Sequence, residues 1–159
     1  MHDIVNLFCE VIDDIENSGI ETGNITEKRE NKRLSKALGR CRKYPDGHFE
    51  IEIQSAFMQD NIEEQGLKNT IAHEILHTCR NSFNHGAEWK RNAETLQAFC
   101  PEYTITRCTD ARKYGYKPKE RTYRHVYKCE ECGQVIKRQR ASNFCQRYIC
   151  GCGGQFTEM

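Results

Sequence analysis

Two histidines and a glutamate form the pattern H-E-x-x-H at residues 73–77, which is typical of zinc-dependent hydrolases. On a helix, His73 and His77 lie four residues apart, so both imidazoles leave the same face and can bind one metal ion. Glu74 follows the first histidine, where its carboxylate can take a proton from a metal-activated water. The pattern therefore predicts a hydrolytic metal site on this helix.

A buried helix with two incidental histidines is the alternative explanation, because the pattern specifies only three residues. A catalytic zinc needs a third protein ligand, and it keeps one position open for water. His85 follows His77 after a short polar segment, and a turn there would bring its imidazole back to the metal. We therefore expect a zinc site on His73, His77 and His85, with Glu74 as the catalytic base.

A second group of candidate ligands lies near the C-terminus, where five of the ten cysteines fall within the last 31 residues. Cys129 and Cys132 form a C-x-x-C-G knuckle, and Cys150 and Cys152 form a shorter C-x-C knuckle. Four thiolates would close the coordination shell, so this zinc would be structural and would stabilise a module with little core. Cys145 lies nearby and is an alternative to Cys150 or Cys152; free thiols in a disordered tail are the other explanation.

Composition indicates a protein with a thin core, since 30% of the 159 residues are charged and the mean hydropathy is −0.83. No apolar run approaches the roughly 20 residues that span a bilayer, and the N-terminus has no secretion signal. We therefore expect a cytoplasmic protein with no membrane partner. Cysteines in that compartment stay reduced, which favours metal ligands over disulfides.

The charge is unevenly distributed along the chain. Residues 1–111 carry 13 Lys/Arg and 19 Asp/Glu, whereas residues 112–148 carry 11 Lys/Arg and 3 Asp/Glu. An acidic domain followed by a basic one suggests a polyanion partner such as DNA, with a basic solvated surface as the alternative. Residues 137–140, Lys-Arg-Gln-Arg, would form a basic ridge suited to phosphate contacts.

Four aromatic residues of the C-terminal region could either stack on bases or form its small core. We expect Tyr127 and Tyr148 in the core, and Tyr123 and Phe144 available for stacking. Stacking of this kind favours single-stranded or frayed DNA as the partner.

Hydrophobic periodicity predicts the elements that must position these side chains. We expect helices over residues 3–17, 67–80 and 86–99, a short helix or turn over 55–65, and a strand over 48–53. Residues 20–30 are polar and are predicted to form a loop. Residues 31–43 are ambiguous, but the turn at 44–47 with a strand after it favours a strand over 38–43.

Together these motifs resemble the SprT-like metallopeptidase family, the group that includes Spartan. The resemblance rests on His73-Glu74-x-x-His77, on His85-Gly86-Ala87-Glu88-Trp89-Lys90, on Leu38-Gly39-Arg40-Cys41, and on a four-cysteine ribbon after the domain. It implies an α+β, zincin-like fold in which helices pack on a small β-sheet, followed by a C-terminal β zinc ribbon. It also implies His73, His77 and His85 as zinc ligands and Glu74 as base.

We therefore expect a SprT-like domain at residues 1–108, a basic linker at 109–122 and a zinc ribbon at 123–159. The predicted activity is that of a zinc metalloendopeptidase with one catalytic and one structural Zn²⁺, acting on protein substrates associated with or crosslinked to DNA. The alternative is a nucleic-acid-binding, transcription-linked module whose metal site is inactive. Glu74 favours the enzyme, because an inactive site has no need of a base. A ribbon used only for protein contacts is a third hypothesis.

Overall fold

The computed structural model describes residues 1–119, 121–140 and 143–159. The chain divides into two compact units, Met1–Lys117 and Pro118–Met159. Each unit has its own hydrophobic core. Within the described part of the chain, no helix is both long and apolar enough to cross a membrane.

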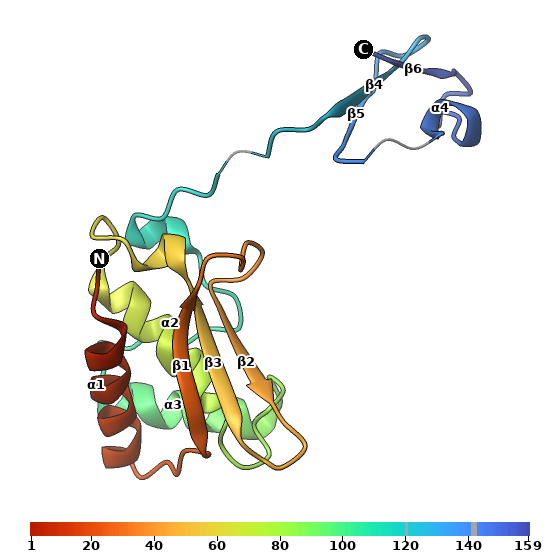
Figure 1. Ribbon diagram of the computed structural model, residues 1–159. Coiled ribbons are helices and arrows are strands. Elements are labelled where there is room, and N and C mark those ends of the chain that lie inside the picture. The colour runs from red at the N-terminus through yellow and green to blue at the C-terminus, as the bar shows by residue number, and fades with distance from the viewer. Residues whose placement is uncertain (120, 141–142) are drawn as a thin grey trace. The chain divides into compact units, whose positions relative to one another are not determined.

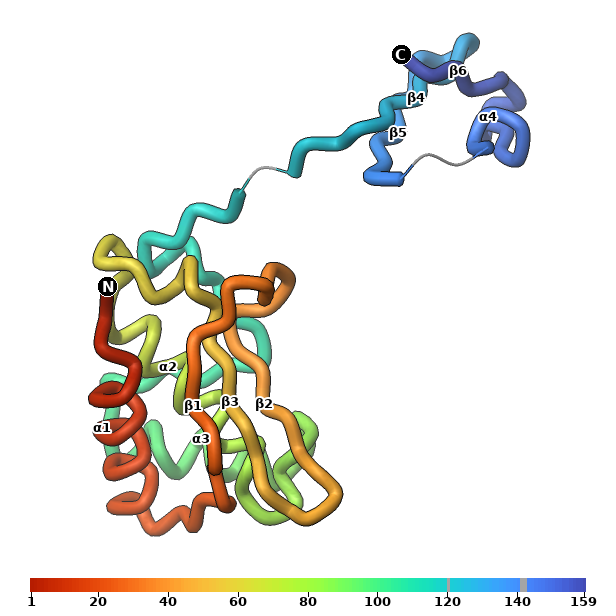
Figure 2. The backbone as a smooth tube through the Cα atoms, in the orientation of Figure 1, coloured from red at the N-terminus to blue at the C-terminus, as the bar shows by residue number. Residues whose placement is uncertain are grey.

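The first unit is an α+β fold in which helices cover a three-stranded sheet (Figure 1). Its elements in chain order are α1 (Ile4–Asn17), β1 (Ile25–Asn31), β2 (Gly39–Lys43), β3 (Phe49–Gln54), η1 (Ser55–Met58), α2 (Glu64–Leu76), α3 (Ala87–Phe99) and η2 (Ala111–Tyr114). Figure 2 follows the same path and shows α1, α2 and α3 on one side of the sheet. The expected α+β class is confirmed.

The sheet has the order β1-β3-β2, with β1 parallel and β2 antiparallel to the central strand β3. On β3, Ile51 and Ile53 are fully buried in the core that includes the helices. The alternation of apolar and polar residues in the sequence predicted this strand at 48–53. Strand β2 is the strand that was expected within 38–43.

The structure differs from the predicted elements in two places, at an unexpected strand and at the ends of helix α2. Residues 20–30 were predicted to form a loop, but β1 occupies Ile25–Asn31. Four consecutive residues of this edge strand are exposed, so its sequence has no alternation of apolar and polar residues, and pairing with β3 makes it a strand. The helix expected over 67–80 spans Glu64–Leu76, with His77 as its C-cap. The backbone then tightens into turns, in which Thr78 Oγ1 donates to the carbonyl of Ile75.

A buried carboxylate ties the three strands together on the sheet face opposite Ile51 and Ile53. Glu52 on β3 is fully buried and accepts hydrogen bonds from Arg29 on β1, at 2.6 Å, and from Arg40 Nε on β2, at 2.9 Å. Burial by itself would raise the pKa of Glu52, but the hydrogen bonds from Arg40 and Arg29 outweigh it and lower the pKa to about 2.

Acid should therefore destabilise this unit through Glu52. A carboxyl group whose pKa is depressed on folding contributes stability above its unfolded value, near 4.5, and loses it as the pH falls towards 2. Between pH 5 and pH 3 this loss amounts to about 2 kcal/mol in the free energy of unfolding. Urea titrations should show that the difference in the free energy of unfolding between wild type and Glu52→Gln becomes smaller as the pH falls from 5 to 3. The exposed Glu94→Gln is the control. A difference of equal size at both pH values would contradict this role of Glu52.

The second unit is a small three-stranded sheet with a one-turn helix. It contains β4 (His125–Cys129), β5 (Val135–Arg138), α4 (Phe144–Arg147) and β6 (Phe156–Glu158), with strand order β5-β4-β6. Its core consists of five buried side chains, Tyr127, Cys129, Phe144, Cys150 and Phe156. Two of these are cysteines, so the apolar core of this unit is small.

Candidate metal centres

The three histidines meet at the end of α2. His73 lies in the last turn of α2, His77 caps the helix, and His85 precedes α3. One ring nitrogen from each lies within 4.8 Å of the others, and His73 Nε2 is 2.9 Å from His85 Nε2. The loop between His77 and His85 thus turns back and brings the imidazole of His85 to the other two histidines. Asn81 in this loop adopts a left-handed conformation with a φ of 58°.

Backbone carbonyls orient two of the three rings. His73 Nδ1 lies 2.9 Å from the carbonyl oxygen of Thr106, and His77 Nδ1 lies 3.1 Å from that of Ser82. A proton on Nδ1 satisfies each carbonyl and leaves the Nε2 lone pair free for a metal. Ser82 is fixed in turn by Asn92, whose amide donates to Ser82 Oγ at 3.1 Å. Thr106, Ser82 and Asn92 have no motif in the sequence and were not predicted.

Trp89 forms the floor beneath the histidines. This buried indole packs against the rings of His73, His77 and His85, with centroid distances of 4.8, 5.7 and 4.7 Å. Its Nε1 donates to the carbonyl of His73 at 3.4 Å. Trp89 shares the buried face of α3 with Ala93 and Leu96, and this face supports the three histidines.

The surroundings of the three histidines favour the neutral imidazole, which is the form that binds a metal. Burial lowers the pKa of all three, and for His73 the neighbouring His77 and His85 bring it down further, to about 4. At His85 the nearby charge of Arg107 adds to the effect of burial. Three imidazoles that converge from helix α2 and the loop before α3, at a site open to a cleft, fit a metal ion such as zinc.

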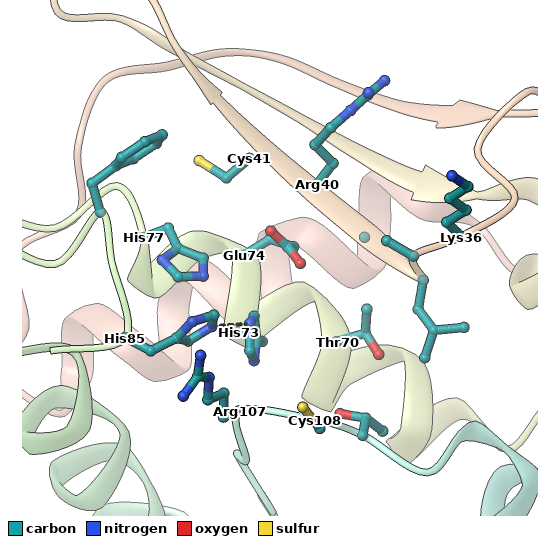
Figure 3. A pocket seen from close by; sticks show the side chains of 15 residues that line it. Lys36, Arg40, Cys41, Thr70, His73, Glu74, His77, His85, Arg107 and Cys108 are labelled. Atoms are coloured by element: carbon teal, nitrogen blue, oxygen red, sulfur yellow. Dashed lines mark hydrogen bonds between the residues drawn. The ribbon is translucent and has the colours of Figure 1, made fainter. Parts of the chain in front are cut away.

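Glu74 lies beside the histidines on the buried side of the site (Figure 3). Burial raises the pKa of its carboxyl group to about 7, and a hydrogen bond from the backbone of Cys41 partly opposes that rise. Gly39 lies against the same side chain. A Cβ at position 39 would come within 2.7 Å of Glu74 Cγ and 2.8 Å of Oε1. Strand β2 therefore sets the position of this carboxylate in two ways: the backbone of Cys41 donates a hydrogen bond to it, and Gly39 leaves the space that it occupies.

Gly39→Ala should displace the Glu74 carboxylate without removing a metal ligand. We expect zinc content to stay at the wild-type level. If Glu74 is the base of a hydrolase, activity should fall by about tenfold to a hundredfold, because small misplacements of a catalytic group carry large costs. Elemental analysis and a protease assay on the same preparation test this. Ala37→Ser, an equally small addition at an exposed position of the same wall, is the control. Full activity in Gly39→Ala would show that Glu74 tolerates movement.

The site opens into a cleft of about 550 Å³. The residues before and at the start of β2 form one wall, and the segment 107–109 forms another (Figure 3). The lining residues include Lys36, Leu38, Arg40, Cys41, Thr70, Phe83, Arg107, Cys108 and Thr109, together with Glu74 and the three histidines. Burial raises the pKa of Cys41 to about 12, so this thiol stays protonated beside the site.

The four cysteines expected in the ribbon also come together. The sulfur atoms of Cys129, Cys132, Cys150 and Cys152 lie within 4.8 Å of one another. Hydrogen bonds from the backbone N–H groups of Cys132 and Glu131 lower the pKa of Cys129 to about 7, which favours the thiolate that a metal binds. Gly154 passes so close that a Cβ there would lie 2.7 Å from Cys129 Sγ. Four thiols in a closed shell fit a structural zinc.

Cys145 does not join this group. It is partly buried and packs against the core of the second unit, outside the four-sulfur cluster. The turn that makes the short C-x-C knuckle possible contains a hydrogen bond from the N–H of Gly153 to the carbonyl of Cys150, and Gly153 has a φ of 90°. Gly133 takes the same place after the longer first knuckle, with a φ of 74° and an N–H that donates to the carbonyl of Cys129.

Two aromatic predictions in the ribbon were wrong. Tyr148 was expected in the core but is 50% exposed, and Phe144 was expected to be available for stacking but is 4% exposed. Phe144 begins helix α4 and packs between Tyr127 and Phe156, at centroid distances of 4.7 and 5.1 Å. The one-turn helix was not predicted, and it turns Phe144 inwards. Tyr127 is buried, as expected.

Comparison with known proteins agrees with this geometry. Residues 6–109 match the SprT-like family, so the chain belongs to that family. Among its relatives is the protein SprT-like of Lactiplantibacillus plantarum, 29% identical over 129 residues, covering 76% of this chain and 75% of the relative. The proteins SprT-like of two Streptococcus suis strains are 29% identical over 137 residues, covering 80% of this chain and 81% of each relative.

Proposed function

We propose that this protein is a zinc metalloendopeptidase. The observation that carries the proposal is that three converging histidines and the buried carboxylate of Glu74, which is outside the ligand group, line the same cleft. A purely structural metal site needs neither an open side nor an adjacent base. Glu74 and the cleft therefore favour the enzyme over a binding module with an inactive site.

The residues divide the work of hydrolysis among them. His73, His77 and His85 would hold a zinc ion, whose Lewis-acid chemistry would polarise a peptide carbonyl and acidify a water molecule. Glu74 accepts the proton of that water on its carboxylate and then delivers it to the departing amine. A carboxyl group can act in both directions, as a base while it is ionised and as an acid once it carries the proton. Thr106 and Ser82 hold the two histidines of the helix in the required orientation.

The proposal is tested by incubating the zinc-loaded protein with an unfolded protein such as casein and identifying the products by mass spectrometry. We expect internal cleavage, loss of activity after chelation, and recovery on adding zinc. An absence of cleavage with full zinc content would reject the peptidase and favour the binding module.

We further propose that the ribbon binds DNA and brings the peptidase to DNA-associated or DNA-crosslinked proteins. The described surface of the ribbon offers exposed Lys137, Arg140 and Arg147, together with the exposed ring of Tyr148. Arg138 lies over the rings of Phe144 and Tyr148, at 4.6 and 5.5 Å. Cations around an exposed aromatic ring suit phosphates and an unstacked base, which supports single-stranded or frayed DNA. Residues 120, 141 and 142 of the basic segment lie outside the described residues.

DNA binding should be strong at low salt and should weaken steeply as salt rises. Each phosphate contact contributes a slope of about −0.7 on single strands and −0.9 on duplex in log affinity against log salt. Anisotropy titrations of wild type should be compared with Lys137→Ala/Arg140→Ala, which leaves Arg138 in place over the aromatic rings. In this double variant we expect the salt dependence to be shallower, with the magnitude of the slope smaller by about 1–2. Tyr148→Ala should weaken binding to single-stranded DNA more than binding to duplex DNA.

The control for that titration is Lys90→Ala/Arg91→Ala, which removes two exposed cations from α3 in the first unit. Its affinity and salt slope should match wild type. A flat salt dependence, or equal affinity in all variants, would reject DNA tethering and leave a peptidase whose ribbon contacts protein.

A further inference from the structure

The cleft carries positive charge in a unit that is negative overall. Residues 1–117 contain 16 Lys/Arg and 19 Asp/Glu, a formal charge of −3. The lining of the cleft nevertheless contains Lys36, Arg40 and Arg107, and its one carboxylate is Glu74, the proposed base. The charge around the metal site is thus opposite in sign to that of the surrounding unit, which indicates selection for an anionic ligand.

The three cations are not equivalent. Arg40 donates two hydrogen bonds to Glu52 on the outer face of the sheet, so its charge is already paired. Lys36 is exposed and lies on the wall that leads into β2. Arg107 is exposed on the opposite side of the cleft, and Figure 3 shows its guanidinium close to His85 and His73. Among the described residues, neither Lys36 nor Arg107 has an acidic partner.

The backbone that carries Arg107 is held in place on both sides. Thr106 accepts the hydrogen bond of the first metal ligand, His73, and its hydroxyl donates to the carbonyl of Cys108 at 3.0 Å. The N–H of Ile105 donates to Gln97 on α3 at 2.7 Å. Arg107 is therefore a free guanidinium on a fixed backbone next to the metal site. This is the arrangement that recognises a carboxylate through two parallel hydrogen bonds.

We propose that Arg107 is a specificity-determining residue of the cleft and binds a carboxylate of the peptide substrate close to the scissile bond. This inference rests on the proposed peptidase function and names its substrate class. The carboxylate is either the side chain of an Asp or Glu flanking the cleaved bond or the C-terminal carboxylate of the peptide. Lys36, on the opposite wall, contributes a weaker attraction because its ammonium is a mobile point charge.

The test uses two sets of synthetic peptides and mass spectrometry of the products. One set is acetylated and amidated at its ends and randomised in sequence, and the other has the same sequences with free C-termini. We expect wild type to enrich Asp and Glu at one position near the cleaved bond of the blocked set. If instead the free C-terminal carboxylate is the ligand, cleavage should occur at a fixed distance from the C-terminus, and the blocked peptides should be poor substrates. Equal cleavage of both sets without acidic enrichment would overturn the proposal.

Charge reversal at Arg107 gives the decisive comparison. Arg107→Ala should lower kcat/KM for the preferred peptide by about tenfold to a hundredfold, mainly through KM, as expected for the loss of a charge-assisted hydrogen bond. Arg107→Glu should shift the enrichment to Lys and Arg. Arg112→Glu makes the same change in charge at an exposed residue outside the cleft lining and should leave the preference intact. A fall in kcat that is equal for acidic and neutral peptides would mean that Arg107 acts on the transition state instead.

Binding separates this inference from the peptidase itself. Fluorescence anisotropy of labelled acidic and neutral peptides on the Glu74→Gln protein measures recognition without cleavage. Acid-selective binding that disappears in Glu74→Gln/Arg107→Ala supports the role of Arg107 even if wild type cleaves nothing, and in that case only the peptidase is rejected. Cleavage by wild type without acid-selective binding rejects Arg107 and keeps the peptidase.

Discussion

Replacing Glu74 by glutamine should abolish hydrolysis while leaving zinc in place. Loss of a general base costs about 10²–10⁴ in rate, because an amide cannot accept the proton of the attacking water. Glutamine has nearly the same size as glutamate, so it fits the space that Gly39 leaves beside the carboxylate. Elemental analysis with a protease assay on the same sample measures both quantities. Loss of zinc in Glu74→Gln would mean that this residue is a ligand and has been assigned the wrong role.

His85→Ala is the matched comparison, because it should remove metal instead of the base. One ring nitrogen of His85 belongs to the group of three, and with two ligands left the affinity for zinc should fall sharply. The carboxylate of Glu88, which is near His85 in the sequence, is outside the group of three and pairs with Arg91 at 2.9 Å. Full zinc content and activity in His85→Ala would place the third ligand elsewhere.

The sequence was sufficient to predict the residues that meet at each site, because metal ligands follow strict rules of type and spacing. His73 and His77 need only helical periodicity, and the two cysteine knuckles need only a tight turn. The central strand β3 was predictable for a similar reason, since packing of one face against the apolar core imposes an alternation of apolar and polar residues on its sequence.

Features that depend on contacts between distant segments were not predictable. Strand β1 has an exposed sequence and exists because it pairs with β3. The support of His73 comes from Thr106, 33 positions further along the chain, through a backbone carbonyl that any residue type could supply. Gly39 was visible in the sequence, but only the structure shows that the space it leaves is filled by Glu74.

The ribbon shows the same limit at a smaller scale. Two tyrosines and a phenylalanine compete for a core of a few side chains, and their composition does not decide which is buried. Helix α4 decides it by turning Phe144 towards Phe156 and leaving Tyr148 outside. The expected site for base stacking therefore moves from Phe144 to Tyr148.

Removing the thiols of Cys129 and Cys132 should reduce the zinc content from two equivalents per chain to one and unfold only the second unit. Binding of a structural zinc contributes about 10–16 kcal/mol, far more than a core of five side chains can replace. The first unit has its own core and should keep both its fold and its peptidase activity on free peptides. Limited proteolysis and elemental analysis of Cys129→Ser/Cys132→Ser should report a stable fragment that ends near Lys117.

Cys145→Ser is the control that decides the ligand set. Cys145 packs against the same core but lies outside the four-sulfur cluster, so its replacement should leave both zinc equivalents bound. Loss of one equivalent in Cys145→Ser would instead assign this cysteine to the metal in place of Cys150 or Cys152. If Cys129→Ser/Cys132→Ser loses both equivalents, the two metal sites depend on each other and the units do not fold independently. If it retains both, the cysteine cluster does not hold zinc, and the ribbon is stabilised by its aromatic core.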